Sequence, residues 1–172
     1  AFAKSLGIAG GTVEALRADV KKNLEREVKF RVQGRNKAAV MDALLASAEL
    51  DLPKALIGSE TERLVEAARA DLKQRGVKDA ATAPIPSELF TAQAERRVRL
   101  GLVVAELVRA HNLQAKPEQL QAHIEEMSQS YEKPAEGMRW YLSDRQRMAE
   151  VEAVVIENNV ASHVLATAKV TD

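Results

Sequence analysis

The stretch NLEREVKFRVQGRNKAAVMDALLASAELDLPKALI, residues 23–57, decides how the rest of the chain is interpreted. Its first part is highly charged and carries an apolar residue about every four positions, which is typical of a helix with one apolar stripe. Pro53 near its end has a fixed φ and no backbone N–H, so it suits the start of a helix and would break a helix interior. The stretch therefore predicts two long helices joined by a turn at residues 51–53. Nothing in it has the character of a catalytic centre.

The first of these helices is expected to begin near Thr12, a good N-cap residue after two glycines. Its apolar stripe comprises Val13, Leu16, Val20, Leu24, Val28 and Val32. Four residues turn a helix by about 400°, so this stripe moves about 40° around the helix at each step and cannot dock on one flat neighbour. A helix that continues to Glu49 would be about 55 Å long, so we expect part of it to project.

The second helix is expected from Pro53 to about Arg75, and it is followed by a loop, residues 76–86, rich in glycine, proline and small residues. Further helices are expected from Ser87 to about His111, from Pro117, from Pro134, and from Asp144 to Ala168, with Val170 and Thr171 extended. Residues 100–108, LGLVVAELV, are apolar nearly all round, which predicts the most buried element. No long strand pattern or repeat is found, so the predicted fold class is all-α.

The composition restricts the class of protein. Apolar residues make up 46% and aromatic residues only 3%, which indicates a thin core of alanine and aliphatic side chains. Basic and acidic residues both number 25, so no net field attracts nucleic acid or an anionic membrane, and no apolar run approaches the roughly 20 residues of a membrane span. Cysteine is absent, which favours a reducing compartment, the cytoplasm. The start, residues 1–4, has neither methionine nor a signal pattern, so we interpret residues 1–172 as a fragment of a longer protein.

Catalytic and metal-binding interpretations have little support in the sequence. His111, His123 and His163 lie far apart and lack the i,i+4 spacing of a helical metal site, so we expect each to be satisfied or exposed to solvent. No nucleophile–base pattern or metal-ligand set is present, and no cofactor is predicted. The one basic cluster, which is formed by Arg96, Arg97, Arg99 and Arg109, is expected to be a solvated or salt-bridged helix face. A nucleic-acid site would need a larger basic surplus and stacking aromatic residues.

An ordered set of short motifs spans the whole chain. It comprises Phe2-Ala3-Lys4, Asn23-Leu24-Glu25-Arg26-Glu27, Asp51-Leu52-Pro53, Ala55-Leu56-Ile57, Glu88-Leu89-Phe90, Gln93-Ala94, Arg97-Val98, Gly101-Leu102, Glu106 and Ala168-Lys169-Val170-Thr171. With these motifs the sequence resembles the C-terminal, substrate-binding domain of bacterial trigger factor, a family of ribosome-associated chaperones. The resemblance implies an all-α, elongated multi-helix domain with two projecting helical arms, a SurA-like arrangement.

The resemblance also implies a function. The family combines a ribosome-docking domain, a prolyl isomerase domain and this helical domain, and the signatures of the first two are not found in residues 1–172. The expected partners are therefore unfolded or nascent polypeptides, bound without nucleotide or other cofactor, while the ribosome would be reached only through the missing N-terminal domain. Self-association is compatible with an apolar cradle. The alternative is a helical scaffold or dimerisation module with one specific partner; such a module predicts a heptad seam, against which the drifting stripe argues.

We expect the client-contacting side chains to cluster on the two helices after Pro134, with further contacts on the second and third helices. The candidates are Met138, Tyr141, Leu142, Met148 and Val151, together with Leu64 and Phe90. Methionine suits this role because its flexible thioether adapts to varied partners. The competing interpretation for each residue is a place in the core. Trp140 is expected to be structural, because burial of so large a ring would stabilise a short helix.

Overall fold

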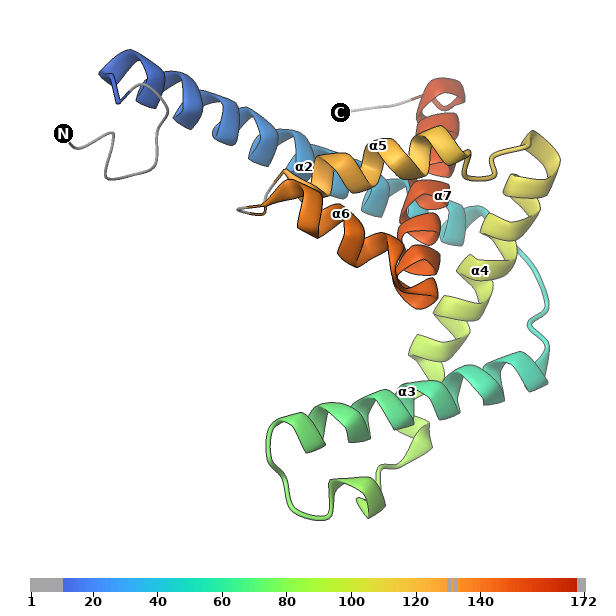
Figure 1. Cartoon of the computed structure of the whole chain (residues 1–172). Coiled ribbons are helices and arrows are strands. Elements are labelled where there is room, and N and C mark those ends of the chain that lie inside the picture. The colour runs from blue at the N-terminus through green and yellow to red at the C-terminus, as the bar shows by residue number, and fades with distance from the viewer. Residues whose placement is uncertain (1–10, 130, 132, 170–172) are drawn as a thin grey trace. The chain divides into compact units, whose positions relative to one another are not determined.

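A computed structural model of the protein describes residues 11–129, 131 and 133–169. In these residues the chain forms six α-helices and two short 3₁₀ helices, with no β-strand (Figure 1). The elements are α2 (Val13–Ser47), α3 (Lys54–Gln74), η1 (Ala80–Thr82), η2 (Ser87–Phe90), α4 (Thr91–His111), α5 (Pro117–Ser128), α6 (Pro134–Leu142) and α7 (Arg145–Thr167). The all-α prediction is confirmed. The expectations for residues 2–4 and for Val170 and Thr171 fall outside the described residues.

Prolines mark the starts of three helices, as the sequence predicts. Pro117 and Pro134 are the first residues of α5 and α6, and Pro53 lies immediately before α3. A proline at a helix start loses nothing by lacking an N–H, because the first N–H groups of a helix have no partner within it.

Side-chain caps begin two other helices. The Thr12 hydroxyl accepts a hydrogen bond from the Ala15 N–H (3.1 Å), which confirms the predicted start of α2. The Asp144 carboxylate accepts from the N–H groups of Gln146 (2.7 Å) and Arg147 (3.2 Å), which fixes the first turn of α7. These hydrogen bonds lower the pKa of Asp144, because they favour its ionised form.

The chain divides into two units, residues 1–39 and 40–172, and α2 runs from the first into the second. None of the described residues 11–39 is buried. The apolar stripe of α2 is therefore exposed: Val20 exposes 47% of its surface and Val28 59%. Ion pairs such as that between Arg31 and Glu27 (2.6 Å) lie on the same helix.

The second unit consists of two groups of packed elements. In one group α3 packs with α4, η1 and η2; in the other α5, α6 and α7 pack with one another, and α4 also contacts α7. The buried apolar residues are Val40, Met41, Leu64, Val65, Ala80, Ala94, Ile124, Val151, Val155, Val160 and Ala161. This set contains no aromatic residue, so the prediction of a thin core of small and aliphatic side chains is confirmed.

The prediction that residues 100–108 form the most buried element is wrong. Ala94 is the one buried residue among those of α4, and the apolar side chains of residues 100–108 are at most half-buried. The reason is the place of α4 in the fold: it contacts α3 and η2 in one group and α7 in the other, so its neighbours cover it only in part.

A polar clasp holds the turn between α4 and α5 against α7. The turn begins at Asn112, whose φ of 53° is left-handed, a conformation that asparagine tolerates better than most residues. The Asn159 amide N–H groups donate to the carbonyl oxygens of Leu113 (3.2 Å) and Gln114 (3.4 Å) and to the Gln119 side-chain oxygen (3.1 Å). The Gln119 amide donates back to the Asn159 oxygen (2.8 Å). Both ends of the turn are thus tied to one residue of α7.

Candidate interaction surfaces

An apolar groove of about 320 Å³ lies where α5, α6 and the start of α7 meet. It is lined by Pro117, Leu120, Gln121 and Ile124 of α5, Met138 and Leu142 of α6, and Met148 of α7. Gln121 is the one polar residue of this lining, and its amide donates to Glu125 of the same helix (2.9 Å). We call this the α5–α6 groove. Its walls offer apolar contact and almost no hydrogen-bonding groups.

The groove rests on the core of the C-terminal helices. Ile124, Val151 and Val155 form this core, with exposed fractions of 1%, 4% and 4%. Met138 and Met148 pack half-buried against it, so part of each side chain faces the core and part lines the groove. Buried aliphatic residues thus hold the flexible methionines in place at the surface.

The structure brings three of the predicted residues together. Met138, Leu142 and Met148 all line the α5–α6 groove, and Leu142 exposes 59% of its surface. Tyr141 packs half-buried against the same core without lining the groove. Val151 is part of the core itself, with 4% of its surface exposed.

The other two predicted residues belong to the α3–α4 group. Leu64 of α3 is buried, with 6% of its surface exposed. Phe90 ends η2 and is half-buried. Neither residue lines the α5–α6 groove. For Leu64 and Val151 the geometry therefore favours the core interpretation, since a residue recurring at helical spacing on the packed side of an amphipathic helix is enclosed by its neighbours.

Trp140 is not buried, contrary to the expectation. Half of its surface is exposed, because it lies on the side of the short α6 that the core does not cover. Its ring meets the Tyr141 ring edge-on, with centroids 4.9 Å apart, and the Arg147 guanidinium lies 3.9 Å from its centroid. Arg147 also donates to the Trp140 carbonyl oxygen. A cation–π contact and a neighbouring ring thus orient the tryptophan at the surface.

A second, shallower groove lies on the other side of α6. It is lined by Tyr131, Lys133, Glu136, Gly137 and Trp140. Gly137 is buried there against the Tyr131 ring, which packs so closely that a Cβ at this position would lie 3.1 Å from it. A hydrogen bond with Tyr131, helped by burial, raises the pKa of Tyr141. Sequence reasoning missed the exposed pair of Tyr131 and Trp140, although two aromatic residues flanking a glycine in a chain with few aromatics could have signalled it.

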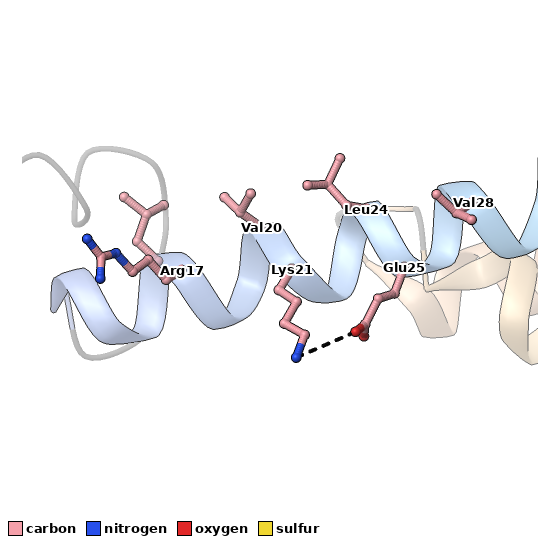
Figure 2. A pocket seen from close by; sticks show the side chains of 7 residues that line it. Arg17, Val20, Lys21, Leu24, Glu25 and Val28 are labelled. Atoms are coloured by element: carbon pink, nitrogen blue, oxygen red, sulfur yellow. Dashed lines mark ion pairs between the residues drawn. The ribbon is translucent and has the colours of Figure 1, made fainter.

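The apolar stripe of α2 is a further open surface, within the first unit. Figure 2 shows the side chains of Val20, Leu24 and Val28 in a row along one side of the helix. Lys21 and Glu25 form an ion pair (3.7 Å) on the flank of this row. The sequence predicts this stripe, although its residues are not among the predicted client contacts.

The basic cluster of α4 is largely paired with carboxylates, which confirms the salt-bridged interpretation. Arg96 pairs with Asp42 (2.5 Å) and Arg97 with Glu60 (3.1 Å). Arg109 pairs with Glu106 (2.6 Å). Their hydrogen bond lowers the pKa of Glu106 and raises that of Arg109. This face therefore has little free positive charge.

The described part of the chain has features of neither a membrane span nor a metal cluster. None of the helices there combines the length and apolar character that a membrane crossing requires. The same residues contain no group of three or more histidines and carboxylates arranged for a metal ion.

Comparison with known proteins agrees with this architecture. Residues 12–166 match the family model described as the C-terminus of bacterial trigger factor protein. The chain is 72% identical over all its 172 residues to trigger factor of Polaromonas sp. strain JS666, and 73% identical over 171 residues to that of Polaromonas naphthalenivorans. It spans 39% of the length of each of these relatives.

A solved structure of trigger factor domains from Thermotoga maritima has the same fold. It superposes with a TM-score of 0.55 at 15% identity, covering 80% of this chain and 83% of the other. At 15% identity this match shows only that the two folds are alike. The family model and the relatives at about 70% identity show common ancestry. The chain thus belongs to the bacterial trigger factor family and matches the C-terminal part of its members.

Proposed function

We propose that this chain is a chaperone domain that binds unfolded or nascent polypeptides through apolar surfaces, without nucleotide, and keeps them from aggregating. The observation that carries the proposal is the α5–α6 groove, in which Met138, Leu142 and Met148 present apolar surface beside an open space of about 320 Å³. Such a surface selects apolar side chains rather than a sequence, because apolar contact is non-directional. Membership of the trigger factor family supports this proposal.

The size of the groove sets the strength of a single contact. One Leu, Phe or Met side chain of a client, fully buried there, would contribute about 1.5–3 kcal/mol. Association costs an estimated 4–15 kcal/mol in lost freedom, so one groove alone binds weakly. The second groove beside Trp140 and the stripe of α2 offer further contacts, and a client that touches several of them gains avidity while each contact still releases quickly.

The activities of a longer parent protein form part of the proposal. We infer that ribosome docking and prolyl isomerisation, where the parent performs them, are supplied by segments other than these 172 residues. The longer parent protein would act in the cytoplasm, where it would encounter nascent chains. Because an apolar groove can also accept a second copy of the chain, self-association at high concentration is expected.

The test is suppression of aggregation with two unrelated unfolded proteins, compared between the native chain and two variants. Leu142→Gln places a polar group in the α5–α6 groove at a residue that is 59% exposed, so it should spare the fold. Leu56→Gln makes the same exchange on α3, at 44% exposure and outside the groove, and is the matched control. We expect the Leu142 variant to suppress aggregation less for both clients, and the Leu56 variant to act as the native chain does.

Two results would count against the proposal. If the native chain protects neither client, or only one, a scaffold with a single specific partner becomes the better explanation. If both variants protect as well as the native chain, the α5–α6 groove is not the contact surface. Far-UV circular dichroism of each variant establishes that any loss is not a loss of folding.

A further inference from the structure

Two histidines that lie 52 positions apart in the sequence meet in the structure. His111 is the last residue of α4, and His163 lies on α7, five residues before Ala168. Their ring centroids are 4.2 Å apart, with the ring planes tilted by 36°. This pair could not be predicted from the sequence, because spacing along the chain does not show which residues of different helices meet.

Within the described part of the chain, neither imidazole interacts with a side chain other than its histidine partner. No hydrogen bond or ion pair involves the ring nitrogens of His111 or His163 there; their one recorded ring contact is with each other. His111 is exposed and His163 half-buried, so the pair can be reached from solvent. Unprotonated ring nitrogens that have no partner are available as ligands.

The backbone around the pair is fixed by the Asn159 clasp. Asn159 lies one helical turn before His163 on α7, and its amide donates to the carbonyl oxygens of Leu113 and Gln114, which follow His111 closely. The clasp therefore holds the two histidine-bearing segments against each other without using either ring. A metal site needs such a rigid scaffold, because its ligands must stay near one geometry.

We propose that His111 and His163 form a two-histidine site for a divalent transition-metal ion such as Zn²⁺. With Zn–N bonds of about 2.0–2.1 Å, two nitrogens on a tetrahedral zinc lie about 3.3 Å apart. The centroids of two imidazoles bound to one such zinc lie about 5 Å apart. The two rings, whose centroids are 4.2 Å apart, must therefore turn away from each other by about 1 Å for one nitrogen of each to reach the ion. The described residues supply no third histidine or carboxylate in a group with them, so water completes the coordination and the affinity is moderate.

The bound ion would have a structural consequence. Because His111 ends α4 and His163 belongs to α7, the metal would join the α3–α4 group of the second unit to its C-terminal helices. Binding would raise the stability of the folded chain, because the unfolded chain holds the two histidines apart. Acid would weaken the binding, since a ligating imidazole must be unprotonated.

The chain offers a clean test, because it contains three histidines and no cysteine. Zn²⁺ is titrated by calorimetry into the full 172-residue chain without a histidine tag, and into the variants His111→Asn, His163→Asn and His123→Asn. We expect one ion per native chain, and a loss of affinity for each of the first two variants at least as large as the roughly 10–100-fold loss that follows removal of a second-shell partner. His123→Asn, on α5, is the matched control and should bind as the native chain does.

The stability of the chain in urea, measured with and without Zn²⁺, distinguishes a metal site from a contact between two histidine rings. The urea midpoint of the native chain and of His123→Asn should rise with added Zn²⁺, and that of His111→Asn and His163→Asn should not. The proposal is overturned if the native chain binds no Zn²⁺, if binding survives in either His111→Asn or His163→Asn, or if all three variants lose it alike. Circular dichroism of each variant establishes that it is folded before it is titrated.

Discussion

Replacement of Asn159 by alanine tests whether the polar clasp fixes the fold of the C-terminal helices. The matched control is Asn158→Ala: Asn158 is the preceding residue of α7 and is exposed, whereas Asn159 is half-buried. Both exchanges raise helix propensity by the same amount, so the difference between the two variants isolates the clasp.

The magnitude follows from the contacts. A side-chain amide has two N–H groups and one carbonyl oxygen, so the clasp amounts to about three hydrogen bonds. At about 1 kcal/mol net for each bond, its full loss would destabilise the chain by about 3 kcal/mol. Water can replace the exposed contact to the Gln114 carbonyl oxygen, which reduces the expected difference to about 2 kcal/mol.

The assay is urea unfolding followed by far-UV circular dichroism, with the midpoints of the two variants compared at equal m-value. We expect the midpoint of Asn159→Ala to lie clearly below that of Asn158→Ala. A difference below about 0.5 kcal/mol, the usual spread for surface substitutions, would refute the reasoning and would also weaken the scaffold argued for the histidine pair.

The remaining predictions concern the core, a cap and one buried candidate. Ile124→Ala should destabilise the chain by about 3–4 kcal/mol in urea unfolding, because this 1% exposed side chain fills the core beneath the α5–α6 groove; Leu142→Ala, at 59% exposure, should change stability by less than about 0.5 kcal/mol. Asp144→Ala should lower the urea midpoint at neutral pH. Because the folded-state pKa of Asp144 is lowered, its stabilisation is present above the unfolded-state value of about 3.9 and disappears as the pH falls through the folded value, so the two midpoints should converge in acid. Leu64→Ala should reduce stability while leaving aggregation suppression per folded molecule unchanged, since Leu64 is buried; a loss of suppression without a loss of stability would restore it as a contact residue.

The sequence predicts the helices well, because their ends are set by local chemistry. A threonine or aspartate whose side chain caps N–H groups, and a proline that lacks one, act over three or four residues, and Thr12, Pro117, Pro134 and Asp144 all stand at helix starts. These helix starts can therefore be predicted without knowledge of contacts between residues that are distant in the sequence. The same holds for the thin core, which follows from a composition with few aromatic residues.

Burial was harder to predict, because it depends on which sides of a helix have neighbours. The apolar run of residues 100–108 is only half-covered, while Leu64 and Val151, proposed as contacts, are enclosed. Trp140 was expected inside and lies half outside. In each case the side-chain type is compatible with both environments, and the packing of helices distant in sequence decides. The grouping of Met138, Leu142 and Met148 was predictable because α6 and the start of α7 are adjacent in the chain.

Helix α2 has one continuous hydrogen-bonded backbone but two different surroundings. None of its described residues up to 39 is buried, whereas Val40 and Met41 are buried. Backbone amides of the first stretch are held by the helix alone, and isolated helices open readily in water, so their hydrogens should exchange with deuterium far sooner than those after residue 40. Deuterium uptake along this one helix would thus show a sharp step near residue 40.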